Sequence, residues 1–306
     1  MGPVKLPAAL ELDLAGRPLV RLADWMPAEI DSVLDFAVEL KSLQALREPH
    51  RLLEGRTLGL LFHQPSTRTR VSLEVAAAQL GATSLYLDAG QLQLARGETV
   101  EDTARVLSRY LDALAVRTYD HAELERLAAA ATVPVLNALT SVAHPLQALA
   151  DLLTIRERFG AIEGVRVAWL GDGNNVCASL AEGCRLTGAD FICASPEGYE
   201  PDDPAIAIVR DPREAVAGAQ VVVTDVWTSM GEDAEREQRL AAFAGYTLDE
   251  GLLDLADPEA IVLHCLPAHP GEEIVAGVLY GPQSAVLDEA ENRLHTAKAV
   301  LALVVA

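Results

Sequence analysis

The segment Ser66-Thr67-Arg68-Thr69-Arg70 combines three hydroxyls and two guanidiniums at the start of a predicted helix. Free backbone N–H groups and the positive end of the helix dipole attract anions to such a start. Arginine there is unfavourable against the dipole unless an anion intervenes. A simple Ser or Thr cap with solvent-facing arginines is the alternative, but the combination of residues favours a phosphate site.

A second motif, His144-Pro145-Leu146-Gln147, also opens a predicted helix. Proline is favoured at the first helical position, so His144 falls at the cap and is presented toward the strand ends. A neutral imidazole there can donate a hydrogen bond to a developing oxyanion. A lone histidine is more often structural or exposed, and that alternative stays open.

A third motif, His264-Cys265-Leu266-Pro267, ends an apolar run. Cysteine beside histidine suggests a nucleophilic thiol or a pair of metal ligands. If both residues lie on a strand, their side chains point to opposite faces, so we expect no direct pairing. Cys265 is then either a small buried residue or a thiol that contacts a ligand.

Two further segments follow predicted strands. The turn 171–176 (GDGNNV) resembles a dinucleotide fingerprint, but Val176 replaces its third glycine, which favours an ordinary tight turn. In segment 225–231 (DVWTSMG), Asp225 could hold an ammonium group at a strand end. The charged residues 232–239 that follow suggest a solvated, mobile lid.

These segments depend on alternating helix and strand patterns along the chain. Such alternation predicts an α/β protein with two domains, each with a central parallel sheet flanked by helices. We expect domains at 1–145 and 146–288, the second Rossmann-like, with a final helix over 289–306 that packs back on the first. The predicted strands are 57–63, 84–87, 113–117, 133–136, 165–170, 190–194, 205–209, 221–225 and 260–266, and the main predicted helices are 23–46, 67–80, 100–110, 121–131, 145–159 and 177–186.

Composition excludes several classes of protein. The chain has 306 residues, of which 50% are hydrophobic, so it can bury a sizeable core. Its net charge of −21 argues against nucleic-acid binding, although a pocket can still be locally positive. Four cysteines without CxxC spacing predict reduced thiols, no bound metal and a cytoplasmic protein. No run is long enough to cross a membrane, so no membrane partner is expected.

Taken together, the motifs resemble the aspartate/ornithine transcarbamylase family, and within it the branch that uses ornithine. The Ser66–Arg70 and His144–Gln147 segments are similar to its two carbamoyl phosphate signatures. The Asp225–Gly231 segment is similar to the amino-acid loop of the ornithine branch, and the 264–267 and 291–295 (ENRLH) segments complete the set in order. The resemblance implies transfer of a carbamoyl group from carbamoyl phosphate to the δ-amine of L-ornithine. The products would be citrulline and phosphate, in arginine biosynthesis or urea-cycle-type metabolism.

The resemblance also implies roles for individual residues and no cofactor. The catalytic residues would be Arg117, His144, Asp225 and Cys265. Ornithine would be bound by Asn175, Asp225, Ser229 and Met230. Carbamoyl phosphate would be bound by Ser66, Thr67, Arg68, Thr69, Gln93, Arg117, His144, Gln147, Cys265, Leu266 and Arg293.

Family members form trimers with shared sites, so a homotrimer or a multiple of trimers is implied. Gln93 would serve the neighbouring subunit, but Gly97 stands where several relatives carry lysine, which puts that loop's contacts in question. Three other interpretations are a transcarbamylase for another amine (putrescine, N-acetylornithine or aspartate), a Rossmann-type dehydrogenase, and a non-catalytic protein on the same fold.

Overall fold

The computed structural model describes residues 14–228 and 233–305. The chain divides into two compact units. The first comprises residues up to Leu153 together with those from Asn292 onward, and the second comprises Thr154–Glu291. In the part of the chain that is described, no helix is both long and apolar enough to span a membrane.

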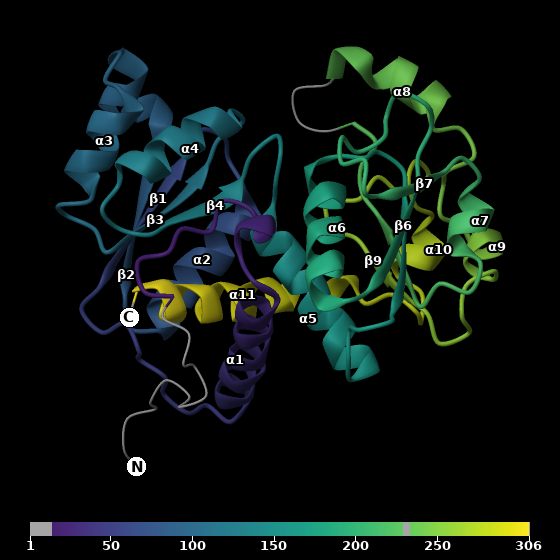
Figure 1. Ribbon diagram of the computed structural model, residues 1–306, viewed down its shortest axis with the longest axis horizontal. Helices are drawn as coiled ribbons and strands as arrows, with labels where there is room; N and C mark the ends of the chain where they lie inside the picture. Colours follow the sequence, from purple (N-terminus) through teal and green to yellow (C-terminus); the bar gives the residue numbers. More distant parts are fainter. Residues whose placement is uncertain (1–13, 229–232, 306) are drawn as a thin grey trace. The chain divides into compact units, whose positions relative to one another are not determined.

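The first unit contains a four-stranded parallel sheet in the order β2-β1-β3-β4. Figure 1 shows α3 and α4 on one face of this sheet, with α2 and α11 on the other. A cluster of buried aliphatic side chains from the sheet and from α3 and α4 fills one of these interfaces. The bounds are β1 Thr57–Phe62, β2 Thr83–Asp88, β3 Ala113–Arg117, β4 Val135–Leu139, α2 Thr67–Gln79, α3 Val100–Leu107 and α4 His121–Ala130.

Strand register brings the carboxyl ends of three strands to one edge of this sheet. Phe62 on β1 is level with Arg117 on β3, and Arg117 is level with Leu139 on β4. The loops after β1 and β4 lead into α2 and into α5 (Pro145–Phe159). In parallel sheets, ligands bind beyond this edge. The fold therefore presents the start of α2, Arg117 and the start of α5 together.

The second unit is built on a five-stranded parallel sheet in the order β7-β6-β5-β8-β9. Figure 1 shows α6 on one face, with α7, α9 and α10 on the other, where a large hydrophobic cluster lies. The strands are β5 Arg166–Leu170, β6 Asp190–Ala194, β7 Ala207–Val209, β8 Val221–Thr224 and β9 Ile261–Leu263. The helices are α6 Asn175–Thr187, α7 Pro212–Val216, α8 Arg236–Ala242, α9 Glu250–Leu253 and α10 Ala276–Leu279.

The remaining long helices are α1 (Pro27–Ala45) and α11 (Val286–Val305). Ile30 and Leu34 of α1 are fully buried on its apolar face, whereas α11 is buried on all sides over most of 292–304. The two parallel sheets with flanking helices confirm the predicted α/β class and two-domain fold.

Several predicted element boundaries were wrong. The first long helix begins at Pro27 instead of residue 23, because Asp24 ends a separate 3-10 turn, where its carboxylate accepts from the Arg21 N–H. The last strand of the second sheet ends at Leu263, three residues before the predicted end. Part of the predicted lid, residues 236–239, belongs to α8. The short helices α7, α9 and α10 were not predicted, since four or five residues carry too little periodicity.

Candidate active site

The start of α2 carries the predicted phosphate motif. Ser66 is the N-cap in an extended conformation, yet among the described residues its side chain makes no capping hydrogen bond. The first N–H groups of a helix have no partner within the helix, so these donors remain available to a ligand. The structure thus contradicts the alternative of an ordinary serine cap. Arg68 is half-buried and has no hydrogen bond or ion pair within the described chain.

Arg293 of α11 connects the two carbamoyl phosphate motifs within the first unit. Its guanidinium is buried and donates from Nη1 to Gln147 Oε1 and from Nη2 to Thr69 Oγ1, both at 2.8 Å. Since Thr69 accepts through its oxygen, its O–H is left to donate. The structure therefore brings Thr69, Gln147 and Arg293 together.

Asp151 orients Gln147. Gln147 Nε2 donates to Asp151 Oδ1 at 2.8 Å, and both residues are buried. With its NH₂ directed to Asp151, the amide presents its oxygen to Arg293 and keeps a second lone pair on that oxygen. Sequence reasoning missed Asp151, although its position four residues after Gln147 places both on one helix face.

His144 is buried and neutral. Burial lowers its pKa well below the ordinary value, and the positive charges of Arg293 and Arg117 lower it further. A neutral imidazole can donate one hydrogen bond without carrying charge itself. His144 therefore has the protonation state that the sequence-based hypothesis requires.

Gln93 is not brought to these residues within the chain. It is exposed at the start of a 3-10 turn, Gln93–Arg96, and no contact with the motif residues is found in the described structure. Gly97 ends this turn with φ +93°. A glycine adopts that left-handed conformation without strain.

In the second unit, Asp225 follows β8 and is surrounded by hydrogen-bond donors. It is buried, and its Oδ1 accepts from the Val226 N–H at 2.8 Å and from Cys265 Sγ at 3.1 Å. Its Oδ2 accepts from Asn174 Nδ2 at 2.9 Å. Asp225 and Cys265, predicted from separate motifs, are thus in direct contact.

The asparagine that contacts Asp225 is Asn174, whereas the asparagine predicted to bind ornithine is Asn175. Asn174 is the N-cap of α6, and its Oδ1 accepts from the N–H groups of Val176 and Cys177. Asn175 is the first residue of α6 and is half-buried. Ser229 and Met230, also predicted to bind ornithine, lie outside the described residues.

The segment after β9 differs from the prediction in a way that matters for chemistry. Because the strand ends at Leu263, the alternation that would separate His264 from Cys265 does not apply. Ligand atoms of Asp225, His264 and Cys265 all lie within 4.8 Å of one another. Leu266 has φ +56°, a left-handed conformation that is rare for leucine and is most often kept at functional sites.

Two groups of side chains have metal-ligand types. In the Asp225–His264–Cys265 group, His264 Nδ1 accepts from the Leu266 N–H and His264 Nε2 contacts Glu273 Oε1 at 3.1 Å, so both ring nitrogens are occupied. In the second group, His269, Glu272 and Glu273, the carboxylates already contact Arg236 and His264. Both groups are held by protein hydrogen bonds and make poor metal sites as they stand.

The turn after β5 is closed to a dinucleotide. A Cβ at Gly173 would lie 2.1 Å from the backbone nitrogen of Pro201, so the chain itself covers the second glycine. In a dinucleotide fingerprint, that glycine lets the pyrophosphate approach the backbone. The dehydrogenase alternative therefore has no phosphate-binding turn here.

Arg239 was predicted to be a solvated lid residue, but it is buried. Its Nη1 donates to Asp172 Oδ2 at 3.1 Å and to the Trp227 carbonyl at 3.0 Å. Its guanidinium also lies over the Tyr199 ring, 5.2 Å from the centroid. Arg239 thus joins α8, the segment after Asp225 and the turn that begins at Asp172.

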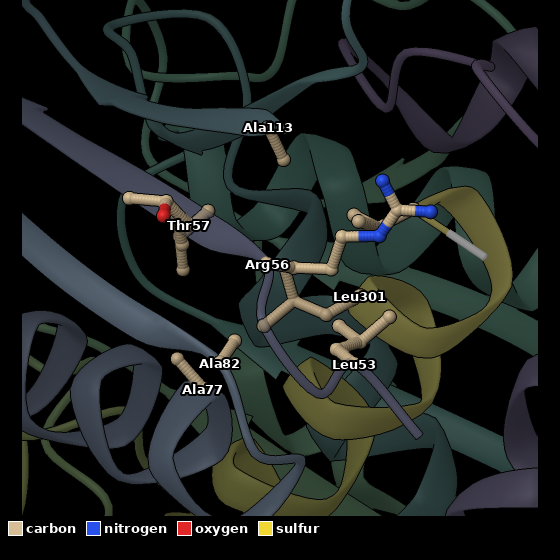
Figure 2. Close-up of a pocket in the computed structure, with 9 residues that line it drawn as sticks. Leu53, Arg56, Thr57, Ala77, Ala82, Ala113 and Leu301 are labelled. Carbon is tan, nitrogen blue, oxygen red and sulfur yellow. The ribbon is translucent and has the colours of Figure 1, made fainter. Parts of the chain in front are cut away.

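A small crevice in the first unit lies away from these residues. Figure 2 shows its lining at the beginning of β1, on α2 and on α11, including Thr57, Ala77 and Leu301. Its volume of about 10 Å³ is at the lower limit for a single water. Because it is at the amino ends of the strands, it does not belong to the candidate active site.

Comparisons with known proteins agree with the motifs. The family model described as aspartate/ornithine carbamoyltransferase, carbamoyl-P binding domain, matches residues 17–157. The model described as the Asp/Orn binding domain of the same family matches residues 163–304. The ornithine carbamoyltransferase of Pyrococcus abyssi is 51% identical over 306 residues, covering 95% of this chain and 96% of the relative. The anabolic ornithine carbamoyltransferase of Pyrococcus furiosus is 51% identical over 307 residues, covering 96% and 98%.

Solved structures give the same result. The ornithine carbamoyltransferase from Pyrococcus furiosus has a TM-score of 0.93 at 50% identity and covers 96% of this chain and 98% of its own. The enzyme of that name from Thermus thermophilus has a TM-score of 0.86 at 46% identity, covering 93% and 97%. Family models, sequence relatives and fold all agree, and this chain belongs to the aspartate/ornithine carbamoyltransferase family of enzymes.

Proposed function

We propose that this chain is an ornithine carbamoyltransferase that works in arginine biosynthesis. It would transfer the carbamoyl group of carbamoyl phosphate to the δ-amine of L-ornithine, releasing citrulline and phosphate. The observation that carries the proposal is the buried set Thr69, Gln147 and Arg293 beside a neutral His144. The relative from Pyrococcus furiosus, which is named anabolic, supports the direction of the reaction.

Carbamoyl phosphate would bind in the first unit, residues up to Leu153 together with those from Asn292 onward. Its phosphate would accept from the N–H groups at the start of α2 and pair with Arg68 and Arg117. Ser66 and Thr67 would add hydroxyl donors. The Gln147 oxygen, already oriented by Asp151, would accept from the carbamoyl nitrogen.

The carbonyl oxygen of carbamoyl phosphate needs donors, because it gains negative charge when the amine attacks. The Thr69 hydroxyl, Arg117 and His144 would supply them. The lowered pKa of His144 keeps the ring neutral, so it acts as a hydrogen-bond donor and needs no proton from solvent. Arg293 would hold Thr69 and Gln147 in place and touch the substrate.

Ornithine would bind in the second unit, Thr154–Glu291. Asp225 would pair with the α-ammonium, and Asn175, Ser229 and Met230 would complete that end of the substrate. Asn174 holds the Asp225 carboxylate in position. The Cys265 sulfur and the Leu266 carbonyl, directed by its left-handed backbone, would orient the δ-nitrogen.

The chemical step requires a neutral δ-amine, whose nitrogen forms a bond to the carbamoyl carbon. The bond from that carbon to the phosphate oxygen then breaks, and the departing phosphate accepts the amine proton. This balance needs no covalent bond to the enzyme, so Cys265 positions the amine without acting as a nucleophile.

A citrulline assay with carbamoyl phosphate and a panel of amines tests the function. We expect the highest kcat/KM with L-ornithine. A higher value with putrescine or N-acetylornithine would reassign the chain to another transcarbamylase, and no turnover of any amine would favour the non-catalytic alternative.

We further propose a cytoplasmic homotrimer in which Gln93 contributes to the neighbouring subunit's site. The exposure of its side chain supports this role. Mixing the inactive variants Gln93→Ala and Arg68→Ala tests it. In hybrid trimers, some sites would combine Gln93 from an Arg68→Ala subunit with Arg68 from a neighbouring Gln93→Ala subunit, and these sites should regain activity. A mixture no more active than the separate variants would refute sharing.

A further inference from the structure

Two buried thiols that the proposed reaction does not use are in contact. The sulfur atoms of Cys177 and Cys193 lie 4.0 Å apart, and both side chains are fully buried. Cys177 is in the first turn of α6, and Cys193 is on β6, 16 positions later in the chain. A disulfide has sulfurs about 2.0 Å apart, so a closure of about 2 Å would join the pair.

The first turn of α6 is linked to the predicted ornithine site by two hydrogen bonds. The Cys177 N–H donates to Asn174 Oδ1 at 3.1 Å, and Asn174 Nδ2 donates to Asp225 Oδ2 at 2.9 Å. Any movement of Cys177 toward β6 therefore acts on the residue that holds Asp225. Interiors are close-packed, so such a movement is transmitted and not absorbed locally.

We propose that Cys177 and Cys193 form a reversible disulfide that ties α6 to β6 and weakens ornithine binding at Asp225. The effect on ornithine rests on the proposed function, whereas formation of the disulfide does not. It would be a modification site of this chain, distinct from Cys265.

Hydrogen peroxide is the oxidant that the step requires, because it is small enough to reach a transiently opened helix end. One thiolate attacks a peroxide oxygen, forming an S–O bond as the O–O bond breaks, and gives a sulfenic acid and hydroxide. The second sulfur then attacks the first, forming the S–S bond as hydroxide leaves. Two electrons pass from sulfur to peroxide oxygen, and the two thiol protons complete two waters.

Reaction should be slow in the folded protein. Burial raises the pKa of the Cys177 thiol well above its usual value, and the neighbouring Cys193 sulfur adds to this effect. Because the thiolate is the nucleophile, oxidation awaits local opening of α6. Cys184, an equally buried cysteine on the same helix, provides a matched control.

The test treats the full chain with hydrogen peroxide, alkylates the remaining thiols in denaturant and maps unreduced peptides by mass spectrometry. Wild type and Cys184→Ala should both give a Cys177–Cys193 cross-link that dithiothreitol removes. Oxidised protein should show a several-fold higher KM for ornithine, with carbamoyl phosphate binding unchanged. Cys177→Ala and, as a second variant, Cys193→Ala should show a smaller rise in ornithine KM than wild type after the same treatment.

All these variants retain Cys265, so damage at that thiol appears equally in each and cancels in the comparison. A cross-link to Cys184, or no cross-link once Cys265 is oxidised, would overturn the proposal. A Cys177–Cys193 cross-link with an unchanged ornithine KM would also overturn it, since the link to Asp225 would be absent. If the chain proved to lack transferase activity, peptide mapping would still test whether the disulfide forms. Calorimetry with ornithine would separately test its effect on ornithine binding.

Discussion

Arg68→Ala should weaken carbamoyl phosphate binding far more than Arg70→Ala. The two arginines lie in the first turn of α2 but differ in their surroundings. Arg70 is exposed, donates to Glu74 Oε1 at 2.9 Å and lies 3.9 Å above the centre of the Tyr86 ring. Arg68 is half-buried and makes no such contact in the described chain. Only Arg68 therefore has a guanidinium that is uncommitted and close to the uncapped N–H groups.

The different surroundings of the two arginines set the expected loss of binding free energy. Loss of a charge-assisted contact to phosphate costs about 2–5 kcal/mol in a desolvated site. Since Arg68 is half-exposed and water screens it in part, we expect the lower end, about 2–3 kcal/mol, or about 30- to 150-fold in Kd. Arg70→Ala should change binding by no more than about 0.5 kcal/mol, roughly twofold.

Calorimetry with a stable phosphonate analogue of carbamoyl phosphate measures both variants directly. Arg68→Lys adds a third point, because lysine keeps the charge but cannot donate to two oxygens in a fork. Circular dichroism melts of each variant control for folding. Wild-type affinity in Arg68→Ala, or equal losses in both alanine variants, would show that the start of α2 does not bind phosphate through Arg68.

Three more outcomes are expected. In steady-state assays, Arg239→Gln should raise the KM for ornithine and leave carbamoyl phosphate binding intact, because the substitution releases the Trp227 segment. The control Arg236→Gln, on the same helix, should change neither. The KM for total ornithine should fall as pH rises through neutrality, since only the neutral δ-amine attacks and its pKa is about 10, as in lysine; a flat profile would contradict this. The folded state lowers the pKa of His144 below 6.5. The stability that this shift contributes is complete above pH 6.5 and is lost as the pH falls through the pKa of the folded state. Urea titrations should therefore show a smaller loss of unfolding free energy between about pH 7.5 and 5.5 in His144→Gln than in wild type.

Residues at strand ends could be predicted from the sequence because helix and strand periodicities are local. The 145–159 helix has the predicted bounds, and Arg117 ends its strand as expected. Those placements bring polar side chains to the carboxyl edges without any knowledge of long-range contacts. The partners of Arg293 are different: Thr69 lies 224 positions away, and no local pattern encodes that distance.

The wrong predictions concern positions where a shift of one residue, or a contact from a distant part of the chain, changes the surroundings of a side chain. Asn174 had no predicted role, because its contact with Asp225 joins residues 51 positions apart in the chain. A strand alternates by residue, so an end at Leu263 removes the reason to separate His264 from Cys265. Arg239 was assigned to solvent because its neighbours are charged. Its burial depends on Tyr199, Asp172 and the Trp227 carbonyl, which come from other parts of the chain.

Net charge and local charge act on different distance scales, which is how an acidic chain can hold a dianion. The chain carries −21 overall, but surface charges in salt are screened over about 8 Å. Buried groups are screened far less, and the pKa of His144 is lowered first by burial and then by the positive charges of Arg293 and Arg117. A phosphate dianion placed there would offset the mutual repulsion of these cations. Burial, reinforced by the same positive charges, lowers the pKa of His144. We therefore expect this arrangement both to attract the phosphate and to leave His144 as a neutral donor for the carbonyl oxygen.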